Sequence, residues 1–457
     1  MPADERGALS CFKAYDVRGR LGDELNEAIA GRVARAFASE LSAQTVVLGR
    51  DPRASSEALA RSVAEALAAQ GVEVLDLGLC GTEEVYFGTD HAGADGGICV
   101  TASHNPMDYN GLKMVAAGSA PLSEAQFSKV RARAEENRFA ALKPGGRIRT
   151  VDFRAAYVDR VMSFVDPASL GPFHLLVNAG NGAAGPTFDA LITGLNGAGA
   201  QIKVTRLHHA PDGTFPNGIP NPLLPEQHPV TGQAVVAAGA DMGIAWDGDF
   251  DRCFLFDHTG AFVPGEYVVG LLAEAFLDQN PGASIVHDPR VVWNTKDIVA
   301  RLGGRAIESR TGHAFVKAVM RDTGAVYGGE MSAHHYFKRF MACDSGMIPW
   351  VMVLGLLARR DKSLADILAA RRAAFPSSGE INFRVKDAVA AMARVEQALA
   401  GEALSRDDTD GLSLEFATWR LNLRRSNTEP LLRLNCEARG AQEVLRQAIE
   451  RVTALIA

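Results

Sequence analysis

The sequence is poor in several features, and each shortage excludes a class of protein. No stretch of its 457 residues approaches the ~18 consecutive apolar residues that a membrane-spanning helix requires. Its net charge of −7 leaves no basic excess that would favour nucleic acid or an anionic membrane as the main partner. We therefore expect neither nucleic-acid binding nor membrane binding.

Cysteine is also scarce. The six cysteines contain no CxxC pair, so they indicate free thiols in a reducing compartment rather than a disulfide framework or a zinc site. Residues 1–7 are polar and do not resemble a signal peptide. We expect a cytoplasmic, soluble protein that is a monomer or a weak homo-oligomer.

What the chain does contain is a weak internal repeat. Each unit has an apolar strand ending in a polar turn, a helix-like stretch, and a second and third strand. First strands are expected at 46–48, 175–177 and 285–286, and third strands at 97–100, 242–245 and 325–327. Strands that alternate with helices indicate parallel sheets covered by helices on both faces.

The predicted fold class is therefore α/β. We expect three tandem α/β domains with mixed, mainly parallel sheets, plus a smaller C-terminal α+β domain, around one central cleft. The C-terminal domain should begin with helices and end in strand–loop–strand–helix. The expected domain bounds are 1–151, 152–256, 257–365 and 366–457.

Polar segments follow the third strand of each repeat. Ligands of an open parallel sheet sit beyond the carboxyl ends of its strands. The three segments are 101–106 (TASHNP), 247–252 (DGDFDR) and 328–335 (GGEMSAHH). Because they differ from one another, we expect them to contribute different groups to one shared site.

The second segment predicts a metal site. Asp247, Asp249 and Asp251 alternate, so an extended or gently curved backbone would point all three carboxylates one way. Three like charges repel unless a cation lies between them, and oxygen ligands of this kind suit Mg²⁺. The alternative is a solvated acidic turn.

The first segment contains a candidate phosphate carrier. Ser103 lies among small residues beside His104, where it could accept a phosphate and pass it to a substrate. The residues alone leave open that Ser103 only caps a turn. No GxSxG motif accompanies it, so a hydrolase triad is not supported.

A third candidate lies near the C-terminus. Segment 424–430 (RRSNTEP) combines an arginine with hydroxyl, amide and backbone donors, the chemistry of a phosphate cradle, although an ordinary turn between strands is the alternative. The chain is acidic, yet several basic groups fall in or beside predicted loops and indicate a focused anion site. These groups are Arg18, Lys113, Arg252, Arg290, His313 and Arg424.

Taken together, five segments closely resemble the α-D-phosphohexomutase family, in particular its bacterial phosphomannomutase/phosphoglucomutase branch. They are 14–19 (AYDVRG), 101–106, 247–252, 329–334 (GEMSAH) and 424–430. The resemblance implies an intramolecular phosphotransferase of the isomerase class. It would interconvert the 1-phosphate and 6-phosphate of mannose and/or glucose through a hexose 1,6-bisphosphate, with Mg²⁺ as cofactor and the bisphosphate as activator.

The resemblance also implies residue roles. Ser103 would be the phosphoserine, and its phosphate would bind Mg²⁺ beside Asp247, Asp249 and Asp251. Arg18, Lys113 and His104 would serve the proton and charge chemistry around it. Glu330 and Ser332 would bind the sugar O3 and O4. The other implied substrate-binding residues are Tyr15, Arg252, Arg290, Thr311, Gly312, His313, His334, Arg424, Ser426, Asn427 and Thr428.

One departure and several alternatives remain. Arg290 stands where the family is expected to have a lysine; arginine binds phosphate well but accepts protons poorly, because its pKa exceeds ~12. Phosphoglucosamine mutase is the close rival, although its sugar loop typically has Gln where this chain has Met331. A metal-dependent sugar phosphatase and a non-catalytic sugar-phosphate sensor also stay open.

Overall fold

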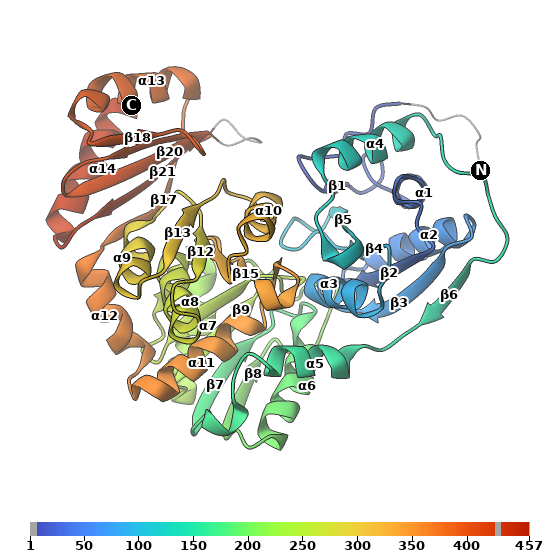
Figure 1. Cartoon of the computed structure of the whole chain (residues 1–457), viewed down its shortest axis with the longest axis horizontal. Helices are drawn as coiled ribbons and strands as arrows, with labels where there is room; N and C mark the ends of the chain where they lie inside the picture. The colour runs from blue at the N-terminus through green and yellow to red at the C-terminus, as the bar shows by residue number, and fades with distance from the viewer. Residues whose placement is uncertain (1–6, 426–430, 457) are drawn as a thin grey trace. The chain divides into compact units, whose positions relative to one another are not determined.

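The computed structural model describes residues 7–425 and 431–456 (Figure 1). The chain divides into two units, Met1–Phe262 with Arg339–Ala358, and Val263–Lys338 with Arg359–Ala457, called unit 1 and unit 2 below. Within the described ranges, no helix is both long and apolar enough to cross a membrane.

A six-stranded sheet with the order β1-β5-β4-β2-β3-β6 forms the first part of unit 1. Only β5 runs against the other strands of this sheet. The strands are β1 (Val17–Arg20), β2 (Thr45–Arg50), β3 (Glu73–Leu79), β4 (Gly96–Val100), β5 (Tyr109–Ala116) and β6 (Arg147–Thr150). The helices are α1 (Glu27–Leu41), α2 (Ser56–Ala68), α3 (Thr82–His91) and α4 (Glu124–Glu135).

Alternate residues of the central strands cover the two faces of this sheet. Val46 and Leu48 of β2 belong to the core that includes α1, α2 and α4. Val47 between them packs on the opposite face with Val85 of α3, and Figure 1 shows these helices on the two sides. Successive side chains of a strand point to opposite faces, so the apolar residues of β2 are buried on both faces of the sheet, as is usual in a parallel sheet covered by helices on both sides.

The repeat continues in the next two sheets. The second has the order β11-β10-β9-β7-β8, and the third includes β13-β12-β14-β15. In both sheets the first strand of the repeat lies between the second and the third, and all three run parallel. A fourth strand follows along the chain and pairs antiparallel with the third. These sheets confirm the predicted α/β class with mixed, mainly parallel strands. The third strand of the last repeat begins at Tyr327, two residues later than the sequence predicts.

The elements of these two sheets have the following bounds. The second sheet has β7 (Phe173–Asn178), β8 (Ile202–Leu207), β9 (Met242–Trp246), β10 (Cys253–Asp257) and β11 (Phe262–Val263), with α5 (Arg154–Met162), α6 (Ala184–Gly197) and α7 (His228–Ala238). The third has β12 (Ser284–His287), β13 (Arg305–Glu308), β14 (Tyr327–Gly329) and β15 (His335–Phe337), with α8 (Gly265–Gln279), α9 (Trp293–Arg301) and α10 (His313–Thr323).

A later segment of the chain returns to unit 1. It contains β16 (Cys343–Asp344) and most of α11 (Ile348–Arg360). The Trp350 ring is fully buried with its centroid 5.4 Å from that of Phe188 on α6, and Phe188 in turn lies 5.5 Å from Trp246. Trp246 Nε1 donates to the Gly346 carbonyl (2.8 Å), which fixes the returning segment against the end of β9.

The C-terminal part of unit 2 is an antiparallel sheet with the order β17-β21-β20-β19-β18. Its core includes residues of α13 and α14. The elements, with the preceding α12, are α12 (Leu364–Ala374), β17 (Ser377–Arg384), α13 (Ala388–Leu399), β18 (Ser405–Asp407), β19 (Leu412–Glu415), β20 (Trp419–Arg425), β21 (Leu431–Ala438) and α14 (Gln442–Ile456). The predicted strand–loop–strand–helix ending is present, but the sequence missed the other three strands. β18 is exposed throughout and β17 is only partly buried, so neither has a strong apolar pattern.

A buried carboxyl group joins parts of unit 1. Glu83 on α3 is 0% exposed and accepts a hydrogen bond from Tyr157 Oη on α5 (2.7 Å). Burial, reinforced by the charges of Glu84 and Asp344, raises the pKa of Glu83 well above its ordinary value. At pH values between its unfolded and its folded pKa, Glu83 therefore keeps a proton in the folded state that it releases in the unfolded chain.

We expect this proton to make stability depend on pH. Because the folded pKa is raised, the contribution of Glu83 is fully present below the unfolded pKa and is lost as pH rises toward the folded pKa. Glu83→Gln keeps an acceptor for Tyr157 but cannot titrate. Its free energy of unfolding, measured by urea titration between about pH 5 and about pH 8, should fall less than that of the wild type. Glu57→Gln, on the exposed side of α2, is the control; parallel curves for Glu83→Gln and wild type would contradict the prediction.

Candidate functional site

Ser103 lies in a strained turn directly after β4. It is 3% exposed, and its φ of 50° is in the left-handed region that L-residues rarely adopt. Its backbone N–H donates to Thr101 Oγ1 (2.9 Å), and its Oγ donates to Asp247 Oδ2 (2.6 Å). The turn therefore directs the hydroxyl toward the acidic segment instead of toward its own backbone.

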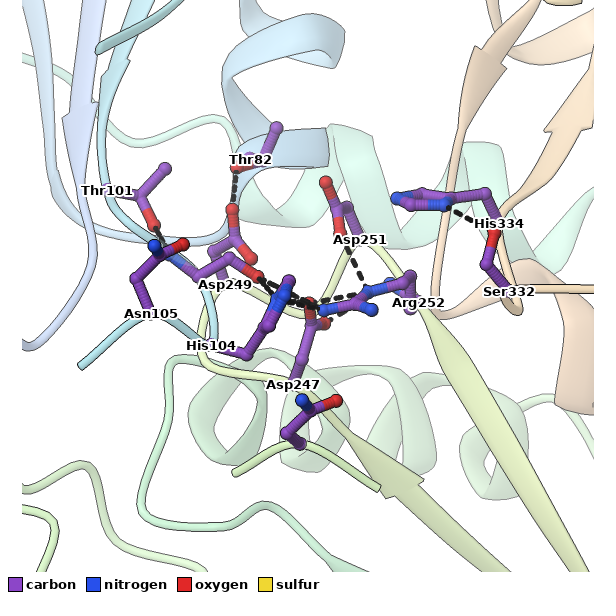
Figure 2. Close-up of polar contacts among 12 residues, drawn as sticks. Thr82, Thr101, His104, Asn105, Asp247, Asp249, Asp251, Arg252, Ser332 and His334 are labelled. Atoms are coloured by element: carbon purple, nitrogen blue, oxygen red, sulfur yellow. Dashed lines mark hydrogen bonds and ion pairs between the residues drawn. The ribbon is translucent and has the colours of Figure 1, made fainter. Parts of the chain in front are cut away.

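The segment after β9 brings three carboxylates together. Oxygen atoms of Asp247, Asp249 and Asp251 lie within 4.8 Å of one another, and all three side chains are buried (Figure 2). The sequence predicted an extended or gently curved backbone here, but the segment contains a turn at Phe250, whose φ is 44°. Its ring packs on Gly81, where a Cβ would lie 2.2 Å from a ring atom. The carboxylates converge through this turn rather than through alternation along a strand.

A cationic group from the first sheet and a hydroxyl group from α3 contact these carboxylates. Lys113 Nζ lies 2.6 Å from Asp249 Oδ2 and 2.5 Å from Asp251 Oδ2. Thr82 Oγ1, at the start of α3, donates to Asp249 Oδ2 (2.6 Å). Lys113 was expected in or beside a loop, but it lies in the middle of β5, from which its side chain reaches the cluster.

The charges in the cluster shift one another's pKa. Burial, with the charges of Asp251 and Asp249, raises the pKa of Asp247 to about 6 despite the opposing guanidinium of Arg252. Burial and Asp251 also oppose ionisation of Asp249, but the charge and hydrogen bond of Lys113, together with the Thr82 hydrogen bond, lower its pKa. The same carboxylates raise the pKa of Lys113 well above its ordinary value against its desolvation.

The donor set fits a divalent cation. All three side chains offer carboxylate oxygens, the ligands preferred by hard cations such as Mg²⁺. Asp249 Oδ1 is buried and has no hydrogen-bond partner among the described residues. Because uncompensated buried charge is costly, an additional cation would stabilise the cluster, which can therefore hold a metal ion.

Arg252 connects the acidic cluster to His104. Its Nε and Nη2 donate to Asp247 Oδ2 at 2.8 and 2.6 Å, and its Nη2 also contacts His104 Nδ1 (Figure 2). His104 Nδ1 lies 3.0 Å from Ser103 Oγ. Burial and the charges of Arg252 and Arg18 lower the pKa of His104 well below its usual range, so the imidazole is neutral.

Arg18 holds the far side of the Ser103 turn. Its Nη1 donates to Asn105 Oδ1 (2.7 Å) and its Nη2 to Asp16 Oδ2 (2.8 Å). Tyr15, whose side chain is among the exposed hydrophobic groups, precedes β1 in the same segment. Arg18 thus lies beside the turn that carries Ser103. Its part in the chemistry at Ser103 stays a prediction.

A buried ion pair beneath this turn was not predicted from the sequence. Asp51 and Arg53 follow β2, and Arg53 is 3% exposed. Arg53 Nη2 donates to the carbonyls of Ser103 (2.8 Å) and Asn105 (2.6 Å), and Nη1 donates to that of Pro106 (3.0 Å). Asp51 Oδ2 accepts from Thr101 Oγ1 (2.7 Å). The polar turn at the carboxyl end of this strand was visible in the sequence and could have identified both residues.

Unit 2 contains a second group of predicted site residues, around Glu330. This side chain is 1% exposed; its Oε1 accepts from the Gly312 N–H (2.8 Å) and its Oε2 from Tyr336 Oη (2.5 Å). Arg290 Nη2 lies 3.3 Å from Ser332 Oγ and 3.8 Å from Glu330 Oε1. Burial raises the pKa of Glu330, although the Arg290 guanidinium opposes the shift.

Arg290 is a fixed positive charge in this group. Its Nη2 donates to Asp288 Oδ2 (2.6 Å), and the surrounding carboxylates raise its pKa further despite its desolvation. It can therefore bind an anion but cannot accept a proton. His334 Nδ1, in the same loop as Ser332, lies 3.4 Å from Ser332 Oγ.

Arg424, near the end of β20, is another predicted site residue of unit 2 that carries a guanidinium group. Its Nη2 lies 2.9 Å from Glu380 Oε2 and its Nη1 lies 3.7 Å from Asp410 Oδ2. Burial and the charge of Arg290 lower the pKa of Arg424, which indicates that the two guanidinium groups repel each other. A dianion bound near them would relieve this repulsion. The other predicted cradle residues, Ser426, Asn427 and Thr428, lie outside the described residues.

Comparison with known families identifies the chain. Models of phosphoglucomutase/phosphomannomutase α/β/α domains I, II and III match residues 10–141, 155–260 and 264–375, and the model of the C-terminal domain matches residues 380–454. The chain belongs to the phosphoglucomutase/phosphomannomutase family. The resemblance recognised in five short segments is thereby confirmed over nearly the whole sequence.

Relatives in this family are similar along their full length. A phosphomannomutase of Salmonella montevideo is 53% identical over 451 residues, which cover 98% of this chain and 99% of the relative. A phosphomannomutase of Escherichia coli K12 is 55% identical, with 94% and 95% covered. The crystal structure of a phosphoglucomutase/phosphomannomutase family protein from Burkholderia thailandensis is 32% identical and has a TM-score of 0.87, with 98% and 97% covered.

Membership of the phosphoglucomutase/phosphomannomutase family settles the class of activity. Enzymes of this family are mutases, a kind of isomerase, and they interconvert hexose phosphates. The family is metal-dependent, in agreement with the buried acidic cluster in unit 1. The class predicted from the motifs is thus confirmed, whereas the roles of individual residues remain predictions.

The carbonyl contacts of Arg53 generate a prediction for this enzyme. Lysine has no planar fork of donors and cannot reach the same carbonyls, so Arg53→Lys should loosen the Ser103 turn. We expect an activity loss of roughly 10- to 100-fold, because the predicted role of Ser103 in phosphoryl transfer depends on its position. The stability loss should be about 1–3 kcal/mol from unsatisfied buried carbonyls. Mutase assays would measure the activity loss and urea unfolding the stability loss. Arg61→Lys, on the exposed side of α2, is the control. Wild-type activity of Arg53→Lys would refute the prediction.

Proposed function

We propose that this enzyme moves a phosphoryl group between O1 and O6 of a hexose, mannose and/or glucose, with Ser103 as the carrier. The observation that supports this most directly is the Ser103 hydroxyl, held in a strained turn 2.6 Å from Asp247 within a buried acidic cluster. Relatives named phosphomannomutase, similar over nearly the whole chain, support the choice of substrate.

The reaction has two half-steps at one serine. The first half-step starts from phosphorylated Ser103. The bond between Ser103 Oγ and phosphorus breaks while a free sugar hydroxyl forms a bond to the same phosphorus, and the proton that the sugar hydroxyl loses ends on Ser103 Oγ. The product is a hexose 1,6-bisphosphate. After this intermediate turns around, its other phosphate is returned to Ser103 by the reverse chemistry. Splitting one difficult transfer into two is the advantage of a covalent carrier.

The residues around Ser103 would control the charge of this transfer. Phosphoryl transfer needs mainly in-line positioning and charge neutralisation. Asp247, Asp249 and Asp251, together with an oxygen of the phosphoserine, would hold Mg²⁺, which when bound supplies positive charge to the transferring group. Arg18, Lys113 and His104 would supply the charge and proton contacts, while Arg252 keeps Asp247 paired.

The residues of unit 2 would recognise the substrate. Arg424 and Arg290, with Ser426, Asn427 and Thr428, would bind the phosphate that is not being transferred. Glu330 and Ser332 would bind the sugar O3 and O4, with Tyr15, Thr311, Gly312, His313 and His334 completing the substrate contacts. O3 and O4 lie near the sugar's centre, so the same contacts can serve both orientations of the intermediate.

These contacts also suggest dual specificity. Glucose and mannose differ only at C2, which Glu330 and Ser332 would not contact in this arrangement. A hydroxyl that is not recognised discriminates weakly, so both sugars should be substrates. A hexose 1,6-bisphosphate should act as activator, because it phosphorylates any Ser103 that has lost its phosphate.

The carrier role of Ser103 is tested by Ser103→Ala. A coupled assay of 6-phosphate formation from mannose 1-phosphate and from glucose 1-phosphate, with Mg²⁺ and a trace of bisphosphate, should show turnover of both sugars. Activity of the variant should fall by at least about 10³-fold, because the covalent route is lost. Ser169→Ala, an exposed serine, should behave as wild type. Steady release of inorganic phosphate would indicate a phosphatase, and binding without turnover would indicate a sensor.

The metal requirement is tested by chelation. Removing divalent cations should lower the mutase rate by roughly 100-fold, and Mg²⁺ should restore it. Asp249→Asn should bind Mg²⁺ more weakly in calorimetry and should not recover in the same way. The matched control is Asp408→Asn, at a carboxylate that is 77% exposed. Full activity in the presence of chelator would contradict the assignment of the acidic cluster.

A further inference from the structure

The turn between β18 and β19 packs directly on Arg424. Gly411 has a φ of +82°, and a Cβ there would lie 2.6 Å from Arg424 Cγ and 2.5 Å from the Leu423 carbonyl oxygen. The neighbouring Asp410 carbonyl accepts from Nδ2 of Asn422, a fully buried residue on the strand that carries Arg424 (3.0 Å). The turn and Arg424 are therefore fixed to each other.

The side chain of Asp410 connects this turn to the loop before α10. Its Oδ2 accepts from the Thr311 N–H (3.1 Å) and lies 3.7 Å from Arg424 Nη1. The next amide, Gly312 N–H, donates to Glu330 Oε1 (2.8 Å). A continuous path thus runs from Arg424 through Asp410 and the 311–312 backbone to Glu330, all within unit 2.

The hydrogen bond, not the ion pair, is the stronger part of this path. Asp410 and Arg424 are partly exposed and 3.7 Å apart, and Glu380 is closer to the same guanidinium, so their ion pair is worth little. An N–H donating to a carboxylate is directional and fixes the loop. Thr311 Oγ1 in this loop is buried without a partner among the described residues, and a ligand hydroxyl could satisfy it.

We propose that Asp410 is a positioning residue that holds the phosphate-binding and sugar-binding groups of unit 2 in register, so that one hexose phosphate engages both. The inference rests on the proposed function, which assigns phosphate to Arg424 and sugar hydroxyls to Glu330. A ligand that uses both groups gains affinity when the protein holds them at the right spacing before binding. Inorganic phosphate would use only the phosphate-binding groups, without Glu330, and gains nothing from that spacing.

The test is calorimetric binding of glucose 6-phosphate and of inorganic phosphate to the full chain. Asp410→Ala removes the acceptor for Thr311 and should weaken glucose 6-phosphate about 10-fold, with inorganic phosphate within about 2-fold of wild type. Asp410→Asn retains an acceptor oxygen and should recover most of the lost affinity. Asp408→Asn, in the same turn, should bind both as wild type does. Equal weakening of both ligands, or equal defects in the alanine and asparagine variants, would overturn the proposal.

A double-mutant cycle with Glu330→Gln measures the coupling itself. If Asp410 acts through Glu330, the combined variant should lose less affinity for glucose 6-phosphate than the product of the two single losses. Losses that simply multiply would show that Asp410 acts independently and would also overturn the proposal. Because the readout is binding, it is separate from catalysis: absent turnover in the wild type would reject the mutase, while the binding pattern would still decide the role of Asp410.

Discussion

The burial of three like charges is the constraint on which unit 1 depends. Asp247, Asp249 and Asp251 are almost completely removed from water, and such a cluster is stable only if positive charge is brought to it. Lys113 comes from the middle of β5, and Arg252 comes from the acidic segment itself. Thr82 at the start of α3 adds a hydroxyl donor. Two sheets that are separate in sequence are therefore joined by electrostatics at the place where Ser103 lies, and the same excess of carboxylate oxygen is what makes the cluster suitable for a metal ion.

A second layer of polar contacts explains how a strained serine is maintained. A left-handed φ at a non-glycine residue costs of order 1–3 kcal/mol and persists only where the surroundings determine it. At Ser103 these surroundings are the Thr101 hydroxyl on its N–H and the Arg53 guanidinium on its carbonyl. Arg53 is itself paired with Asp51, whose Oδ2 lies 3.4 Å from Arg53 Nε and whose Oδ1 accepts from the Arg53 N–H (3.0 Å). A buried ion pair contributes little net stability in general, but here it places four backbone carbonyls, those of Ser103, Asn105, Pro106 and Tyr109, around one cation. Its effect is to define the geometry of the turn.

The sequence predicted those parts of the molecule that rest on periodicity and on local motifs. Strands such as β4 and β9 are apolar throughout and end in distinctive polar segments, so both their class and their position were visible. Lys113 was placed wrongly because a lysine in a strand normally faces solvent, and only the tertiary arrangement shows that it faces the carboxylates. The return of residues 339–358 to unit 1 could not be predicted, because the packing of Trp350 against Phe188 joins segments that local patterns treat independently. The exposed edge strand β18 was missed because it buries no alternating face.

The repeat carries one further regularity, which concerns backbone rather than side chains. The polar segment after each third strand contains a non-glycine residue in the left-handed region: Ser103, Phe250 and Ala333, with φ of 50°, 44° and 70°. All three are buried, so none is held by solvent-exposed turn chemistry. A strand that continued straight would carry its next polar groups past the edge of the sheet, whereas a left-handed residue folds the segment back over the strand ends. In the third repeat this is directly visible, since Glu330 N–H donates to the His334 carbonyl across the turn at Ala333 (2.9 Å). The three repeats therefore share a method of presenting side chains while differing in which side chains they present: Ser103 in the first, the three carboxylates in the second and Glu330 in the third.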